Sequence, residues 1–239
     1  MNVSDESVQM ETLVASSGLF DRWHWLYAFF RERLFANHTD LIAGFMRARP
    51  SDPQCATFIE LGCGPGFYSA QLARKFPHWK ILGLDTSARL LERARRRVAM
   101  LGLSNCHFEV ADVTRLSGVS ERAGFILASR LFLVLQNRSE SLNGIYNLLR
   151  PGGALLIAEP RENWRTELPL NCMKALDRFT IPRISRQTEE TCRSVSYMEL
   201  DNLLAGQRWS GICRWTDQRY QYAFCEKPSL NFREKETAS

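Results

Sequence analysis

Hydrophobic and polar positions alternate in two different patterns along the middle of this chain. Five short apolar runs are predicted to be buried strands, at residues 57–61, 79–84, 106–110, 125–128 and 154–158. Longer segments with apolar residues at intervals of three or four are predicted to be helices, at residues 67–76, 87–101 and 143–149. Strands that alternate with helices at this spacing form parallel sheets joined by right-handed crossovers. The pattern therefore predicts an α/β fold with a doubly wound, mostly parallel sheet.

The N-terminal region follows a different pattern. Residues 1–18 are polar, whereas residues 19–34 carry aromatic and aliphatic side chains at helical spacing. A second helix is predicted at residues 39–48. We therefore expect residues 1–50 to form a tail and two helices that precede an α/β domain at residues 51–230.

The C-terminal region breaks the alternation of strands and helices. Residues 161–208 are predicted to hold two or more helices in place of a single crossover. The final two strands, at residues 211–215 and 221–225, are separated by five residues, which are too few for a parallel crossover. These two strands are therefore predicted to form an antiparallel hairpin, followed by a tail at residues 231–239.

Composition narrows the classes of protein that fit. Of the 239 residues, 45% are hydrophobic and 24% are charged, which is ordinary for a globular domain and excludes extensive disorder. The longest apolar runs are far shorter than the roughly 20 residues that span a bilayer. Residues 1–18 lack the basic start and apolar segment of a secretory signal, so a cytoplasmic location without a membrane span is expected. The seven cysteines lack the spacing of metal sites, and no metal is expected.

A glycine-rich segment lies where the first predicted strand meets the first helix of the domain. Gly62, Gly64 and Gly66 allow the backbone to turn sharply and to approach a ligand closely. A dinucleotide-binding fingerprint would need its third glycine at position 67, where this chain has Phe67. The Gly-Lys-Ser or Gly-Lys-Thr of a phosphate-binding loop is also missing. The segment therefore favours a nucleoside-like ligand over a dinucleotide or a nucleoside triphosphate, which are bound through their phosphates.

Two acidic residues follow neighbouring strands of the same predicted sheet. Asp85 ends the second strand, 19 residues after Gly66, where a carboxylate can accept the hydroxyl protons of a ribose. Asp112 follows the third strand. Because the carboxyl ends of parallel strands share one edge of a sheet, Asp85, Asp112 and the glycine segment are expected to lie together.

These features resemble class I S-adenosylmethionine-dependent methyltransferases over about residues 55–227. The resemblance is carried by the loop from Glu60 to Gly66, by Asp85, by the turn at Ala111-Asp112 and by Leu149-Arg150-Pro151-Gly152-Gly153 before the fifth strand. It implies a seven-stranded sheet whose last strand is antiparallel, with helices at residues 1–50 that cap the cofactor pocket. It also implies S-adenosyl-L-methionine as the cofactor.

The resemblance also implies roles for individual residues. Gly62 and Gly64 are expected to line the methionine part of the cofactor, Glu60 to reach its amino group, and Asp112 to accept from the adenine amine. The full set of expected cofactor-binding residues is Glu60, Gly62, Cys63, Gly64, Gly66, Asp85, Thr86, Asp112, Val113 and Ser129.

Methyl transfer from a sulfonium needs alignment more than it needs a catalytic group. A general base is required only when the acceptor arrives protonated. By resemblance, the N-terminal helices bring His24 or Tyr27 near the methyl group, although an aromatic stripe on a helix also suits simple packing on the sheet.

Two further catalytic candidates follow strands at the ligand-bearing edge. Arg130 is placed to orient an acceptor carboxylate, and Glu159 to act as a base or hydrogen-bond acceptor. Alternatively, Glu159 forms an ion pair with Arg130 or with Arg161. A nucleophilic role for Cys63 is disfavoured, because no basic residue adjoins it in the sequence.

The acceptor is expected to be a small, partly apolar metabolite that is methylated on oxygen, nitrogen or carbon. The alternatives are an RNA or protein methyltransferase and a non-catalytic cofactor-binding partner subunit. Nucleic acid is disfavoured, because the net charge is only +5 and Ser129-Arg130-Leu131-Phe132 lacks an Asn-Pro-Pro-Tyr type motif. Either a monomer or a homodimer is compatible with the sequence. Insert residues 161–208 are expected to shape the acceptor side of the site.

Overall fold

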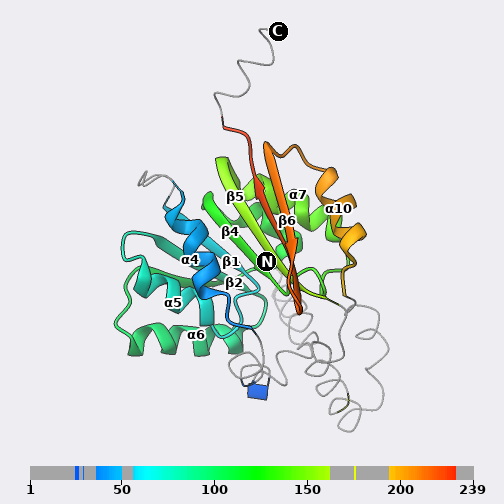
Figure 1. Cartoon of the computed structure of the whole chain (residues 1–239). Coiled ribbons are helices and arrows are strands. Elements are labelled where there is room, and N and C mark those ends of the chain that lie inside the picture. The colour runs from blue at the N-terminus through cyan, green and yellow to red at the C-terminus, as the bar shows by residue number, and fades with distance from the viewer. Residues whose placement is uncertain are drawn as a thin grey trace, which may run out of the picture.

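A seven-stranded sheet forms the centre of the protein (Figure 1). The computed structural model describes residues 25–26, 29, 36–49, 56–161, 175 and 194–229. The strand order is β3-β2-β1-β4-β5-β7-β6, in which β1 to β5 pair in parallel and β7 pairs antiparallel with both β5 and β6. The strands are β1 Thr57–Leu61, β2 Lys80–Asp85, β3 Cys106–Val110, β4 Ala123–Ser129, β5 Leu149–Pro160, β6 Gly211–Thr216 and β7 Tyr220–Glu226. The predicted doubly wound sheet with a C-terminal antiparallel hairpin is confirmed.

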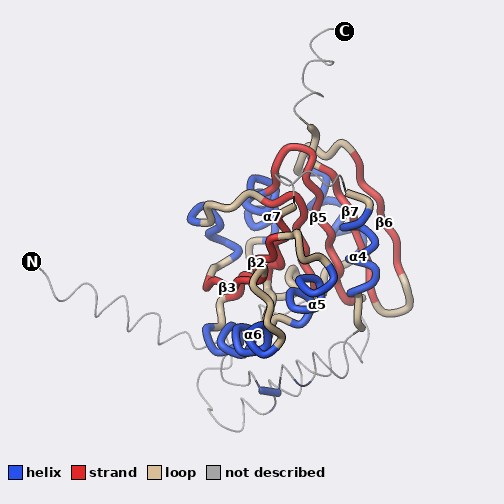
Figure 2. The backbone as a smooth tube through the Cα atoms, turned by 90° about the vertical axis from the view of Figure 1, so that its left-hand side faces the viewer, coloured by secondary structure: helices blue, strands red, loops and turns tan. Residues whose placement is uncertain are grey.

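Helices cover both faces of the sheet, as the two perpendicular views show (Figures 1 and 2). One face packs against α4 Thr39–Arg47, α5 Phe67–Lys75 and α6 Ala88–Met100, and the other against η1 Val113–Gly118, α7 Arg138–Leu148 and α10 Tyr197–Ala205. Each face has its own apolar core. β1 and β4, in the middle of the sheet, are buried over almost their whole length, and such strands appear in a sequence as short apolar runs.

The largest difference from the sequence prediction concerns β5. Residues 149–153 are expected to be a turn before a strand at 154–158, yet the strand begins at Leu149 and continues to Pro160. The pairing with β4 shifts register between Ala123 and Phe125, so an irregularity in the ladder accommodates Pro151, Gly152 and Gly153. Similarly, α7 begins at Arg138, five residues before the predicted start of that helix.

Several predicted elements lie outside the described residues. Of the helix predicted at 19–34, only residues 25, 26 and 29 are described, and all three are helical. His24 and Tyr27 lie outside the described residues, as does most of the insert, of which α10 is described. No helix in the described part of the chain is long and apolar enough to cross a membrane.

Candidate active site

The glycine-rich loop connects β1 to α5 in a backbone conformation that favours glycine. Gly62, Gly64 and Gly66 all have positive φ, at 67°, 53° and 68°. A Cβ atom at Gly66 would lie only 2.8 Å from both Ala94 Cβ and Phe108 Cζ. The loop therefore needs glycine at position 66 both for its turn and for the close packing of α5 and α6 behind it.

Asp85 joins the end of β2 to the glycine loop. Its Oδ2 accepts a hydrogen bond of 2.8 Å from the backbone N–H of Gly64, and its Oδ1 accepts one of 2.9 Å from the N–H of Ser87. A carboxylate has about four acceptor positions, so its two oxygens can each accept more than one hydrogen bond. The structure thus places the expected ribose acid in direct contact with the loop.

The other expected cofactor residues end or follow neighbouring strands at the same edge of the sheet. Asp112 is exposed after β3, and its Oδ1 caps η1 by accepting from Thr114 N at 2.9 Å. Thr86 is exposed after β2, and Ser129 is half-buried at the end of β4. The side chain of Val113 is in the apolar core, so only its backbone is available to a ligand.

Glu60 is buried and serves as a cap for the helix that follows the loop. Its Oε2 accepts from both the backbone N–H of Ser69, at 2.9 Å, and the Ser69 hydroxyl, at 2.5 Å. The N-cap residue of α5 is Gly66, which has no side chain to accept from the first turn. A carboxylate at this position also interacts favourably with the N-terminal end of the helix dipole. Contact between Glu60 and a cofactor amino group stays a prediction.

Cys63 lies within the loop but faces the core. Only 3% of the residue is exposed, and its Sγ would be 2.9 Å from a Cβ atom at Gly83. Burial, and then the nearby carboxylates of Asp85 and Glu60, raise the pKa of the Cys63 thiol well above its usual value. The thiolate that a nucleophile requires is therefore disfavoured.

Arg130 follows β4 in a strained backbone conformation. Among the described residues, Arg130 is the only non-glycine residue with a positive φ, which is 57°. The backbone N–H donates to Ala158 O at 2.9 Å, and the guanidinium Nη1 donates to the Tyr220 hydroxyl at 3.3 Å. Such conformations cost about 1–3 kcal/mol and concentrate at functional sites. Arg130, which is expected to lie at the ligand-bearing edge of the sheet, is thus also a residue with a strained backbone.

Glu159 is fully buried and binds the backbone that follows Arg130. Its Oε1 accepts from Leu131 N at 2.7 Å and from Phe132 N at 2.9 Å. Its Oε2 has no hydrogen-bond partner among the described residues. Neither ion pair considered from the sequence, with Arg130 or with Arg161, is found within the described part of the chain. Glu159 therefore fixes the path of the loop after β4.

The loop that follows β4 packs against the glycine-rich loop. The side chain of Leu131 reaches to 3.2 Å from the position that a Cβ at Gly62 would occupy. Glu159, at the end of β5, thus acts on the glycine loop through Leu131. The contact connects the expected acceptor side of the site to its cofactor side.

The stability of the protein is expected to depend on pH through Glu159. Burial raises the pKa of this carboxyl from 4.5 to about 7, against the opposing effects of the Phe132 and Leu131 amides and of the Arg130 charge. Between these two values the folded state holds a proton that the unfolded state has released, so the free energy of unfolding falls as pH rises. The fall amounts to about 3 kcal/mol, because a tenfold change in proton affinity corresponds to about 1.4 kcal/mol.

Urea unfolding of the wild type and of Glu159→Gln at about pH 5 and about pH 8 measures this effect. The variant lacks the carboxyl, so the wild type should lose stability relative to it over this range. Glu140→Gln, at an exposed position on α7, is the matched control and should follow the wild type. Parallel curves for the wild type and Glu159→Gln would contradict the prediction.

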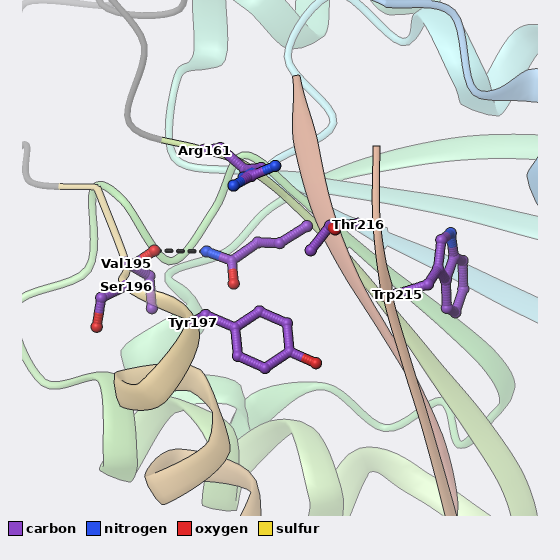
Figure 3. A pocket seen from close by; sticks show the side chains of 7 residues that line it. Arg161, Val195, Ser196, Tyr197, Trp215 and Thr216 are labelled. Atoms are coloured by element: carbon purple, nitrogen blue, oxygen red, sulfur yellow. Dashed lines mark hydrogen bonds between the residues drawn. The ribbon is translucent and has the colours of Figure 1, made fainter. Parts of the chain in front are cut away.

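A cavity of about 630 Å³ lies farther along the same edge, beside β6, β7 and the start of α10 (Figure 3). Arg161, which directly follows β5, lines it together with Tyr197 and Thr216. The side-chain amide of Gln221 donates to the carbonyl of Val195 within this cavity. The cavity therefore combines a cationic side chain with aromatic and polar groups on the side where an acceptor is expected.

Sequence reasoning missed a buried polar cluster next to Arg130. The His38 ring lies 3.1 Å from the Tyr222 hydroxyl through Nε2 and 3.0 Å from the Tyr68 hydroxyl through Nδ1. Tyr222 in turn donates to Asp217 Oδ2 at 2.6 Å. The partners come from the N-cap of α4, from α5, from β7 and from the turn before β7, so no local pattern reveals the cluster. The alternation Tyr220-Gln221-Tyr222 indicates only that the two tyrosines share one face of a strand.

The fold, the left-handed glycine loop and the acid bonded to it together define a class I methyltransferase-like protein. The Methyltransferase domain family matches residues 54–224, and the chain belongs to that family. A trans-aconitate 2-methyltransferase of Deinococcus radiodurans is 35% identical over 105 residues, which cover 44% of this chain and 38% of the relative. Matches to the curated relatives of this name span less than half of their length.

Solved structures show the same fold at low sequence identity. A SAM-dependent methyltransferase from Methanosarcina mazei superposes with a TM-score of 0.52 at 20% identity, covering 72% of this chain and 92% of the other. The [4+2]-cyclase SpnF superposes with a TM-score of 0.57 at 17% identity, covering 80% of each chain. Because a cyclase shares the fold, the activity has to be argued from the residues of the site.

Proposed function

We propose that this protein transfers a methyl group from S-adenosyl-L-methionine to a carboxylate oxygen of a small-molecule acceptor. The observation that carries the proposal is the hydrogen bond between Gly64 N and Asp85 Oδ2, which joins the glycine loop to the expected ribose acid. The relatives named trans-aconitate 2-methyltransferase support a small carboxylate acceptor.

The residues at the loop suit this cofactor. Glycines at positions 62 and 64 let the backbone approach a ligand directly, and Asp85 presents carboxylate oxygens, the acceptor type that suits ribose hydroxyls. Asp112 is exposed at the end of the neighbouring strand and would accept from the adenine amine. When bound, the cofactor supplies an electrophilic methyl group on a positively charged sulfur.

A carboxylate acceptor removes the need for a general base. At neutral pH such an acceptor is already ionised, so no proton has to leave its nucleophilic oxygen. The task of the chain is then to hold the acceptor in line, and good alignment lowers barriers by roughly 7–11 kcal/mol. Arg130 would bind the carboxylate, because a guanidinium matches its geometry. In this proposal Glu159 orients the loop after Arg130 and transfers no proton.

Replacing Arg130 tests the proposal. Arg130→Gln is expected to raise KM for trans-aconitate by about 100-fold, because a charge-assisted, bidentate contact would be lost. The affinity for S-adenosylmethionine should stay within about twofold of the wild-type value, because Arg130 is not among the expected cofactor residues. The matched control is Arg96→Gln on the exposed surface of α6, where Arg96 pairs with Glu92.

Labelled S-adenosylmethionine also separates the proposal from its alternatives. The wild type should transfer label to trans-aconitate or to another small carboxylic acid. Label that appears only in RNA or protein from an extract would contradict the proposal and favour a macromolecular acceptor. Tight binding of the cofactor without any transfer would favour the non-catalytic partner subunit.

A further inference from the structure

Tyr220 occupies a rigid position beside Arg130. It is the first residue of β7 and only 2% exposed. Its backbone N–H donates to Asp217 Oδ1 at 2.6 Å, and the same oxygen accepts from Arg219 N at 2.7 Å. The Asp217 carboxylate therefore fixes the turn between β6 and β7, and with it the point from which the Tyr220 side chain extends.

Two aromatic contacts fix the ring of Tyr220. The imidazole of His38 meets it nearly perpendicularly, with ring centroids 4.5 Å apart, and the ring of Tyr222 stacks beside it at 6.2 Å. Edge-to-face and offset-stacked geometries are the favoured arrangements of such rings. The Tyr220 hydroxyl, at the far end of this ring, is the group that accepts from Arg130 Nη1.

His38 is itself held through both ring nitrogens. Tyr222 has one hydroxyl proton and donates it to Asp217, so its oxygen is left to accept from His38 Nε2–H. On the other side, His38 Nδ1 and the Tyr68 hydroxyl are 3.0 Å apart. His38 is 7% exposed as a residue, and these contacts hold its ring at a fixed angle behind Tyr220.

We infer that Tyr220 is a positioning residue, which directs the Arg130 guanidinium toward the acceptor carboxylate, and that the hydrogen-bonded chain of exposed Asp217, buried Tyr222 and buried His38 holds Tyr220 in place. The inference rests on the proposed function, because it concerns how the same acceptor is bound. It accounts for the grouping of two tyrosines, one histidine and one aspartate beside a residue with a strained backbone.

The physical basis is the flexibility of arginine. A guanidinium on a long side chain loses considerable conformational freedom when it is held in one geometry for a bidentate contact. A phenol oxygen on a fixed ring accepts one of its N–H groups and restricts the side chain before the acceptor arrives. The strained φ of 57° at Arg130 restricts the backbone in the same way.

Tyr220→Phe removes the hydroxyl and keeps the ring that packs against His38. We expect KM for trans-aconitate to rise about five- to tenfold, with kcat and the affinity for S-adenosylmethionine unchanged. Tyr146→Phe is the matched control, because the Tyr146 hydroxyl bonds to the Arg208 carbonyl in an exposed region away from this edge. An unchanged KM in Tyr220→Phe would overturn the inference.

A double-mutant cycle distinguishes positioning from a structural role. If Tyr220 acts through Arg130, Tyr220→Phe should add less than about twofold to KM in the Arg130→Gln background. A structural role would raise KM by the same factor in both backgrounds, and that result would also overturn the inference. Thermal unfolding of each variant verifies that the fold is retained.

Tyr222→Phe tests the supporting chain, because it breaks the link between His38 and Asp217 without touching Arg130. We expect a smaller rise in KM, of about two- to threefold, in the same direction. Should this variant unfold, His38→Gln compared with His38→Ala provides the second measurement, with the smaller rise expected for Gln, which retains a donor.

Calorimetric titration of trans-aconitate, in the presence of S-adenosylhomocysteine, tests the positioning role of Tyr220 separately from the proposed acceptor class. If the wild type binds and Tyr220→Phe binds equally well, the positioning role is wrong and the proposed acceptor class stands. If the wild type binds neither trans-aconitate nor other small carboxylates, the acceptor class is wrong and the positioning role is overturned with it.

Discussion

Replacing Asp85 with Asn is expected to lower the affinity for S-adenosylmethionine by about 100-fold or more while leaving the fold intact. The carboxylate would provide two charge-assisted hydrogen bonds to ribose hydroxyls, each worth about 1.5–3 kcal/mol. The Asn amide cannot serve both Gly64 N and Ser87 N as the two carboxylate oxygens do, since its nitrogen is a donor. Loss of the ribose contacts and loss of the hydrogen bond from Gly64 N should both lower the affinity for the cofactor.

Isothermal titration with S-adenosylmethionine and with its demethylated product measures this loss. Asp40→Asn is the matched control, because Asp40 is an exposed carboxylate on α4 that pairs with Lys75. Its affinity for the cofactor should equal that of the wild type. If Asp85→Asn bound the cofactor as tightly as the wild type, the ribose role of Asp85 would be wrong.

The centre of the sheet could be predicted because its strands are buried. β1, in which every residue is buried, begins and ends at the predicted residues, since a largely apolar run leaves little freedom in where a buried strand stops. β3 at the sheet edge also has the predicted bounds, although His107, Glu109 and Val110 are exposed. The hairpin of β6 and β7 could be predicted from the length of its connection alone. By contrast, Pro151, Gly152 and Gly153 suggest a turn, and only pairing with β4 shows how a longer β5 absorbs them.

The candidate site was predictable where its residues follow strand ends. Asp85 and the glycine loop lie close together because consecutive parallel strands deliver their carboxyl ends to one edge. The direction in which a side chain points at that edge could not be predicted from the sequence. Glu159 ends β5 as expected, but its binding of the Leu131 and Phe132 amides depends on tertiary packing.

The His38 cluster shows the limit of reading one sequence. His38 is 30 positions from Tyr68 and 184 positions from Tyr222 along the chain, and each residue alone resembles an ordinary core or surface residue. Their contact requires α4 and α5 to pack beside β7, which follows only from the completed sheet order. Polar networks that join distant segments leave no periodic signal in hydrophobicity.

Gly66→Ala is expected to lower the free energy of unfolding by about 2–6 kcal/mol. A left-handed backbone costs a non-glycine residue about 1–3 kcal/mol, and forcing a methyl group into a filled core adds about 1–3 kcal/mol. At Gly66 the new Cβ would lie 2.8 Å from Ala94 Cβ and Phe108 Cζ, where neither a helix nor a packed ring can easily move.

Gly102→Ala separates these two causes. Gly102 has nearly the same φ, 64°, but no atom lies within 4 Å of the Cβ that alanine would add. The Gly102 variant should therefore lose only the cost of the backbone conformation, about 1–3 kcal/mol. Denaturant unfolding of both variants measures the difference, which isolates the packing of α5 and α6 behind the glycine loop. Equal losses in the two variants would show that this packing is adaptable and that Gly66 is needed for its backbone conformation alone.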